Sequence, residues 1–337
     1  TGVLRPDATN GLPSAEITIA EVLRPLGYAT AYIGKWHLGG RPGMRSRDQG
    51  FDEYFGVPHN LDRFETVHFE AEGGPPVLRN DEVVQRPAVP AELTALYTRE
   101  ALSFIHRHRE RPLFLVVAYQ MPHIPFDASP RFRGQSARGL YGDAIEELDW
   151  SVGEILHVLR ALGLASNSVV VFTSDNGPER HTPGSAGVLR GTKHTVYEGG
   201  LRVPFLVWGP GRVPAGIVCD VPMSALDLLP TFAKLAGAAP PTDRALDGVD
   251  MTPVWMGQSG GPVRPRVLCA LYGFGSQRLA SVREGHWKLV YGRNGEVELY
   301  RLDQDPQESE NLAEREPDRV AGLLAELERW RRETGTP

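Results

Sequence analysis

A short apolar run that gives way at once to polar turn formers is the strongest constraint on the fold of this chain. Residues 169–172 (VVVF) are predicted to form a strand buried on both faces of a parallel sheet, because such strands are continuously apolar. The apolar run ends at residues 173–178 (TSDNGP), which favour a turn. Ligands of open α/β sheets bind at the carboxyl ends of the strands. Asp175 and Asn176 therefore lie where a site is expected.

These two side chains have the chemistry of a hard-cation site. A carboxylate beside a carboxamide offers oxygen ligands, which suit Ca²⁺ or Mg²⁺ better than a metal that prefers sulfur. The alternative is that Asp175, Asn176 and Gly177 are simply a turn, for which all three residue types are common. The tripeptide alone leaves both interpretations open.

Lys193 follows in the same stretch, after a loop rich in glycine and serine at residues 184–187. Flexible glycine segments allow a lysine to approach an anion without a bulky backbone in the way. The alternative is an ordinary solvated loop lysine.

Composition limits the class of protein. The chain has 337 residues, 41% of them hydrophobic and 23% charged, which is typical of globular proteins and not of disordered or membrane proteins. The net charge of −6 argues against a general nucleic-acid binder but leaves room for a small anionic substrate bound by a local positive cluster. Cys219 and Cys269 lack metal-site spacing, and we expect two free buried thiols. No apolar stretch reaches the length of a membrane span.

Strand and helix patterns alternate along the first part of the chain, which predicts a doubly wound α/β sheet flanked by helices. A stretch rich in Arg, Asp, Pro and Gly at residues 41–90 is expected to form loops. The expected helices are 14–26 with Ser14 as N-cap, 93 to about 111, 142–164 and 224–235, and the expected strands are 28–33, 113–119, 169–172 and 203–208.

The pattern changes after Gly257. Residues 259–266 (SGGPVRPR) resemble a linker, and short strands separated by turns follow, with an amphipathic helix from about Pro317. The expected strands are 267–272, 280–283, 286–291 and 297–302. We therefore predict two domains, a catalytic α/β domain at residues 1–257 and a subdomain at 258–337 with a small antiparallel sheet and a helix.

Two further strand ends carry candidate site residues. If residues 35–37 remain extended, Lys35 and His37 point to one face while Trp36 points to the other and packs. An ammonium and an imidazole side by side are suited to binding a tetrahedral oxyanion. His123, placed between two prolines after the strand 113–119, is a third candidate, although a lone histidine is more often structural.

Several motifs resemble those of the sulfatase family, over nearly the whole chain. They are GYATAYIGKWHLG at 27–39, TSDNGPE at 173–179, LRGTKHTVYEGGLRVPF at 189–205 and the tail REGHWKLVYGRNGEVELYRLDQDPQESENLA at 283–313. The resemblance looks closest to the branch of arylsulfatase A and N-acetylgalactosamine-6-sulfatase. It implies an alkaline-phosphatase-like fold and hydrolysis of an aryl or carbohydrate sulfate ester.

The resemblance also implies roles for the candidate residues. Asp175 and Asn176 would be ligands of Ca²⁺, with Mg²⁺ as the alternative. Lys35 would bind the sulfate group, and Lys193 would contact the sulfate and the leaving oxygen. His37 would lie against a formylglycine hydrate, the nucleophile of the family. His123 would face the substrate oxygen.

The sequence departs from the family pattern in two respects. It contains no Cys-x-Pro-x-Arg or Ser-x-Pro-x-Arg signature for the formylglycine, and no paired N-terminal aspartates for the metal. We expect both before Thr1, so that this chain alone is a poor catalyst. Where relatives often carry Ser after Pro-Tyr, residues 58–60 read Pro-His-Asn, which leaves the role of Asn60 open.

Two other functions stay open beside the sulfatase hypothesis. One is hydrolysis of a phosphate or phosphonate ester, and the other is binding of a sulfated glycan without cleavage. The expected partner is a small-molecule or glycan sulfate ester and not a nucleic acid, and no membrane segment is expected in this chain. Export of many family members suggests a periplasmic or extracellular location, and the sequence does not define the oligomeric state.

Overall fold

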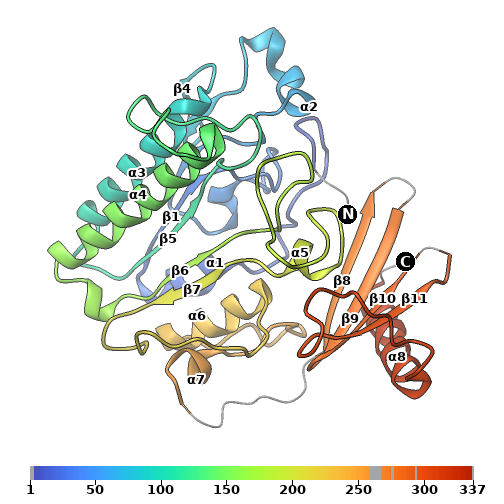
Figure 1. Ribbon diagram of the computed structural model, residues 1–337. Helices are drawn as coiled ribbons and strands as arrows, with labels where there is room; N and C mark the ends of the chain where they lie inside the picture. Colours follow the sequence, from blue (N-terminus) through green and yellow to red (C-terminus); the bar gives the residue numbers. More distant parts are fainter. Residues whose placement is uncertain (1–3, 259–266, 275–276, 293, 336–337) are drawn as a thin grey trace.

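The computed structural model describes residues 4–258, 267–274, 277–292 and 294–335, and Figure 1 shows their arrangement. A larger α/β part holds the N-terminal three quarters of the chain, and a small sheet with one helix lies beside it. The predicted α/β class with a small C-terminal antiparallel sheet and helix is confirmed.

The larger sheet has five strands in the order β4-β3-β2-β1-β5. β1 pairs in parallel with β2 on one side and with β5 on the other, while β3 and β4 extend the sheet in antiparallel fashion. The parallel strands therefore end at the same edge. The bounds are β1 Ala29–Gly34, β2 Glu53–Gly56, β3 Val77–Arg79, β4 Glu82–Gln85 and β5 Leu113–Ala118.

Helices cover both faces of this sheet (Figure 1). Alternate residues of β5 face opposite sides: Leu115 and Val117 pack with the cluster that includes Tyr97 of α3, whereas Phe114 contacts Phe232 of α6 at a ring-centroid distance of 6.1 Å. This is the two-faced burial expected for a doubly wound sheet. The helices are α1 Ile19–Leu23 and α6 Leu228–Ala236 on one face, and α3 Pro90–Arg107 and α4 Gly139–Ala161 on the other.

The first helix is shorter than predicted and is capped by Thr18, not Ser14. The Thr18 hydroxyl accepts a hydrogen bond from the Glu21 amide at 3.2 Å, and the Glu21 carboxylate accepts one from the Thr18 amide at 2.8 Å. This capping box satisfies two amides that have no partner inside the helix. Residues 24–26, which include Pro25, then continue as a 3₁₀ turn.

The prediction that residues 41–90 form only loops is wrong. The segment holds β2, β3 and β4, together with the short helix α2 (Arg63–Thr66). These strands span three or four residues and carry charged side chains at exposed positions, so they show no clear period in the sequence.

The strand that follows α4 also differs from its prediction. β6 (Val170–Thr173) pairs antiparallel with β7 (Phe205–Trp208), and within the described residues it has no other strand partner. Phe172 is 40% exposed and Leu206 is 59% exposed, so the strand is not buried on both faces. The apolar run identified the strand correctly but not its pairing, because pairing depends on residues distant in sequence.

The small sheet has the order β11-β10-β9-β8 and is antiparallel throughout (Figure 1). Leu323 and Leu327 of α8 pack against its buried face with Val282, Leu289 and Leu299. Its elements are β8 Val267–Phe274, β9 Gln277–Glu284, β10 Trp287–Tyr291, β11 Val297–Arg301 and α8 Pro317–Thr334. The predicted linker 259–266 lies outside the described residues, and the domain boundary at 257 stays a prediction.

The structure also bears on the predictions about membrane spans and cysteines. No helix within the described residues has the length and apolar character needed to cross a bilayer. Cys219 and Cys269 are both free, but Cys219 is exposed, so its predicted burial is wrong.

A buried ion pair joins the small sheet to the larger part of the chain. The Lys288 ammonium of β10 lies 2.9 Å from a carboxylate oxygen of Glu198, at the start of α5 (Glu198–Leu201), and 2.9 Å from one of Glu308. Glu308 also accepts a hydrogen bond from the Glu198 amide at 2.6 Å. All three residues are at most 4% exposed. Their charges therefore lie in a region of low dielectric, where each carboxylate is stabilised by the ammonium and the ammonium by the carboxylates.

We predict that Lys288→Met lowers the free energy of unfolding by about 3–5 kcal/mol, because the buried Glu308 carboxylate loses the Lys288 ammonium and Glu198 keeps only the Arg283 guanidinium, 3.4 Å away. Urea unfolding followed by tryptophan fluorescence measures the change, since Trp287 is the neighbouring residue in β10. Lys234→Met on an exposed position of α6 is the matched control and should stay within about 0.5 kcal/mol of the parent. Equal effects of the two substitutions would contradict the prediction.

Candidate functional site

Three parallel strands each deliver a histidine shortly beyond their carboxyl ends. His59 follows β2, His37 follows β1 and His123 follows β5. Since β2, β1 and β5 are neighbours in the sheet, the three segments emerge at one edge. This is the position at which open α/β sheets bind ligands.

The segment after β1 is held between its neighbours on both sides. The Lys35 amide donates to the Ala118 carbonyl at 2.8 Å, and the His37 amide donates to the Pro58 carbonyl at 2.9 Å. Backbone hydrogen bonds therefore carry the parallel alignment past the end of the strand. His37 then adopts a φ of +54°, so the extended conformation expected for residues 35–37 ends at this residue.

Trp36 points away from the two polar side chains, as predicted. It is 6% exposed and packs against Tyr32 and Phe51, with ring-centroid distances of 5.0 and 6.3 Å. Its indole N–H donates to the Met44 carbonyl at 3.0 Å. This anchoring fixes the backbone from which Lys35 and His37 project.

Lys35 is the central cation of the site. Its ammonium donates a hydrogen bond to the Asn60 side-chain oxygen at 2.9 Å, which gives Asn60 a place in the site as the partner of this lysine. Burial lowers the Lys35 pKa, the negative charge of Asp175 opposes this shift, and the positive charge of Lys193 reinforces it. Lys35, Asp175 and Lys193 therefore act on one another electrostatically.

The loops after β6 bring Asp175 and Lys193 to this edge. The Lys193 amide donates to the Pro178 carbonyl at 2.8 Å, and the Gly177 amide donates to the Gly200 carbonyl at 2.9 Å. The two loops approach so closely that a Cβ at Gly177 would lie 1.9 Å from the Gly199 carbonyl oxygen. Glycine is therefore required beside Asp175.

His123 completes the predicted set. Its Nδ1 lies 2.8 Å from the Ile124 carbonyl oxygen. Burial lowers the His123 pKa, that hydrogen bond opposes the shift, and the positive charges of Lys193 and Lys35 lower the pKa further. The His37 pKa is also lowered, mainly by burial and by Lys35.

The structure thus brings five predicted residues together: Lys35, His37, His123, Asp175 and Lys193. Asn176 follows Asp175 in the same loop and is half-buried. The roles assigned to these six residues remain predictions.

His59 and Glu65 belong to the site but were not predicted. They are 4% and 5% exposed, and His59 Nδ1 lies 3.8 Å from Glu65 Oε2. The His37 and His59 rings are 5.4 Å apart between centroids and nearly perpendicular. Burial, followed by the charges of His37 and His68, lowers the His59 pKa to about 4. If β2 had been recognised in the sequence, His59 would have been placed just beyond a strand end, as His37 was by the predicted strand 28–33.

The donor set at Asp175 and Asn176 fits a hard cation. The Asp175 carboxylate is exposed and has no side-chain hydrogen bond to the other described residues, so a cation can bind it without displacing one. Calcium takes about six to eight oxygen ligands. Asp175 and Asn176 can supply part of that set, and the rest must come from other groups.

The charges of the site suit an oxyanion. Two ammonium groups, two half-buried imidazoles and the buried imidazole of His59 meet at one edge, which offers positive charge and hydrogen-bond donors to a tetrahedral anion. A family model described as Sulfatase matches residues 1–238. The chain belongs to the sulfatase family. A second family model, described as N-sulphoglucosamine sulphohydrolase, C-terminal, matches residues 191–333.

Relatives of known name lie in the predicted branch of the sulfatases. N-acetylgalactosamine-6-sulfatase of Canis lupus familiaris is 41% identical over 74% of this chain and 51% of its own length. Arylsulfatase A of Homo sapiens is 33% identical over 92% of this chain and 69% of its own length. The chain thus spans about half the length of the first of these relatives, and the family resemblance is confirmed.

Solved structures support the fold. The crystal structure of Ps i-CgsB is 28% identical, with a TM-score of 0.87, over 97% of this chain and 77% of that chain. The same protein in complex with k-i-k-neocarrahexaose gives a TM-score of 0.86, 28% identity and the same coverage of both chains. The predicted alkaline-phosphatase-like fold is confirmed.

We predict that His59 makes the stability of the sulfatase chain dependent on pH between about 6.5 and 4. Its pKa is lower in the folded state, so the unfolded state takes up a proton first as the pH falls, and stability is lost through this window. A shift from about 6.5 to 4 corresponds to a loss of roughly 3 kcal/mol. Urea unfolding at a series of pH values measures the slope.

Two variants make this measurement specific to His59. His59→Gln cannot titrate and should give a shallower slope than the parent in this window. His106→Gln changes an exposed histidine and should leave the slope unaltered. If both variants keep the parental slope, the assigned pKa of His59 is wrong.

Proposed function

We propose that the protein to which this chain belongs hydrolyses a sulfate ester. The observation that carries the proposal is the meeting of the Lys35 and Lys193 ammonium groups with the His37 and His123 imidazoles, in a chain of the sulfatase family. Two cations match the oxygens of a sulfate ester, which carries a single negative charge. Additional charge develops on these oxygens and on the leaving oxygen during cleavage, and the same cations stabilise it.

The histidines are suited to moving protons. Because their pKa values are lowered, both His37 and His123 are neutral near pH 7 and can accept a proton through a ring nitrogen. We assign His37 to the side of the nucleophile, where it would accept a proton, and His123 to the side of the substrate oxygen. The leaving oxygen needs a proton, for which His123 or Lys193 is the available donor. Asn60 orients Lys35 through the hydrogen bond between their side chains.

The proposal includes two groups that this chain does not supply alone. The nucleophile is a formylglycine from a segment outside these 337 residues. Asp175 and Asn176 would hold Ca²⁺, with Mg²⁺ as the alternative, together with ligands from the same outside segment. A bound cation there would offset negative charge on the sulfate oxygens.

We favour a carbohydrate sulfate over an aryl sulfate as the natural substrate. One relative is named as a sulfatase of N-acetylgalactosamine 6-sulfate, and a related structure holds a neocarrahexaose. An aryl sulfate would still report on the chemistry, because the groups named above are assigned to the sulfate group and the leaving oxygen, both of which an aryl sulfate also has.

We predict that Lys193→Ala and His37→Ala each lower kcat on an aryl sulfate by about 10²–10³-fold in a longer protein that includes the nucleophile segment. Each change removes a group that interacts with charge or a proton formed during cleavage. Initial-rate assays with a chromogenic aryl sulfate measure the loss, and Lys234→Ala, at an exposed position of α6, is the control for lysine removal.

Full turnover in both variants would refute the assignment of these residues. The ratio of kcat/KM for sulfate and phosphate esters of the same phenol separates a sulfatase from a phosphate or phosphonate ester hydrolase. Binding of a sulfated sugar without any turnover would instead identify a non-catalytic member of the family.

A further inference from the structure

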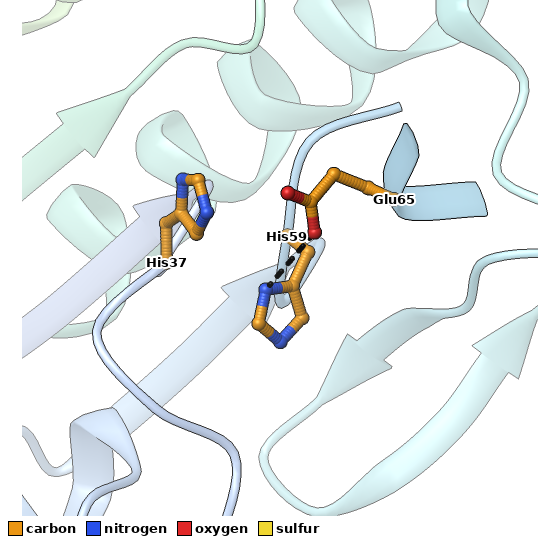
Figure 2. A group of neighbouring side chains, drawn as sticks. All are labelled: His37, His59 and Glu65. Atoms are coloured by element: carbon orange, nitrogen blue, oxygen red, sulfur yellow. Dashed lines mark ion pairs between the residues drawn. The ribbon is translucent and has the colours of Figure 1, made fainter. Parts of the chain in front are cut away.

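A second cluster of ligand groups lies beside the sulfate-binding residues. His37, His59 and Glu65 each present one nitrogen or oxygen atom, and these atoms all lie within 4.8 Å of one another. The three residues come from different segments, one after β1, one after β2 and one in α2. Figure 2 shows the Glu65 carboxylate turned toward the imidazoles, with the 3.8 Å contact between Glu65 Oε2 and His59 Nδ1 drawn as a dashed line.

Two atoms of this cluster lack the hydrogen bonds that buried polar atoms normally make. His59 Nδ1 and Glu65 Oε2 are buried and have no hydrogen-bond partner among the described residues. Their separation of 3.8 Å is too long for a hydrogen bond between them. Most buried polar groups in proteins have a partner, and an unpartnered one costs about 1–3 kcal/mol. Both side chains are more than nine-tenths buried, so bulk water does not replace the missing contacts.

The donor set identifies the class of ligand. Two imidazoles and one carboxylate form a set that proteins use for zinc, with a fourth position left to water or substrate. Imidazole nitrogen suits Zn²⁺, Cu²⁺ and Ni²⁺, whereas Ca²⁺ and Mg²⁺ take oxygen. The cluster is therefore chemically distinct from the oxygen donors of Asp175 and Asn176.

The spacing is close to what such an ion needs. Ligand atoms about 2.1 Å from a tetrahedral zinc lie roughly 3.4 Å apart. The 3.8 Å between His59 Nδ1 and Glu65 Oε2 is near this value, and the limit of 4.8 Å for the cluster requires side-chain adjustment of about 1 Å. The Leu4 carbonyl oxygen accepts a hydrogen bond from His37 Nε2 at 2.8 Å, so an ion bound at this nitrogen would replace that hydrogen bond, with the Leu4 oxygen beside it as a further ligand.

The surrounding charges both favour and oppose a cation. The Lys35 ammonium repels one, and it already acts on His37. The carboxylates of Asp62 and Glu65 act on Lys35 in the opposite sense, so the local positive charge is partly offset.

We propose that His37, His59 and Glu65 bind one divalent transition-metal ion of the zinc type, at a site separate from the hard-cation ligands Asp175 and Asn176. The ion occupies a nitrogen lone pair of His37. A consequence that rests on the proposed function is inhibition: an imidazole bound to the metal cannot accept a proton during sulfate ester cleavage. Transition-metal ions would then act as reversible inhibitors.

The 337-residue chain is sufficient to test the site. Isothermal titration calorimetry with Zn²⁺, in excess Ca²⁺ to occupy oxygen sites, should show one tight equivalent. His59→Gln and Glu65→Gln should each weaken zinc binding at least about tenfold. Even loss of a group that only contacts a metal ligand lowers metal affinity by about 10–100-fold. The controls are His106→Gln and Glu110→Gln, which make the same substitutions at exposed positions.

A second measurement covers the case in which a variant does not fold. In the parent chain, side-chain ¹⁵N resonances of His37 and His59 should shift on addition of Zn²⁺, while that of His106 should not. Co²⁺ in place of Zn²⁺ should give the intense visible absorption of a four-coordinate ion. The proposed site would be refuted if neither the ¹⁵N shifts nor the Co²⁺ absorption appeared. Equal binding of Zn²⁺ by the parent and by folded His59→Gln and Glu65→Gln variants would also refute it.

The inhibition is tested separately in the longer, active protein. Zn²⁺ should lower turnover of an aryl sulfate in the parent, and Glu65→Gln should raise the zinc concentration needed for half-inhibition at least about tenfold. If that protein has no turnover at all, the proposed function fails while the calorimetric and spectroscopic results still decide the metal site. Zinc binding with undiminished turnover would refute the inhibitory consequence alone.

Discussion

The Lys288 ammonium, buried between the carboxylates of Glu198 and Glu308, is the contact on which the arrangement of the chain depends. It connects β10 of the small sheet to the start of α5, and α5 closes the loop that carries Lys193. Arg190, in the same loop, reinforces the connection because its guanidinium donates to the Tyr300 hydroxyl at 2.7 Å. The small sheet therefore helps to set the position of a residue at the candidate site, although it contributes no candidate residue itself.

The site follows from the parallel alignment of three strands. Because β2, β1 and β5 run in one direction, the segments after them emerge together, and backbone hydrogen bonds from residues 35–37 maintain the alignment beyond the sheet. Buried Trp36 fixes the segment from below. Lys35 is thereby held among groups that are far apart in sequence. Its charge interacts with those of Asp175 and Lys193. The rigidity of the sheet supplies the precision that an anion site needs.

Sequence patterns predicted the α/β class, most helices and five of the residues that meet at the sheet edge. They succeeded where the signal is local: apolar runs for β5 and β6, helical periodicity for α3 and α4, and polar residues directly after a strand. They failed for β2, whose four residues include Glu53 and carry no period, and His59 was missed with it. The antiparallel pairing of β6 with β7 was also missed, because the partner of a strand is set by contacts between distant segments.

Two buried charged clusters in this sulfatase chain differ in a way that indicates what each does. In the first, the Lys288 ammonium lies 2.9 Å from carboxylate oxygens of Glu198 and Glu308, so the charges offset one another and stabilise the contact between two parts of the fold. In the second, His59 and Glu65 are also buried, but their facing atoms are 3.8 Å apart, too far for a hydrogen bond, and apolar side chains would fill the same space at lower cost. The contact between two parts of the fold explains why the first cluster is charged, whereas no such contact explains the second. A ligand bound at the second cluster would therefore add to the stability of the folded chain.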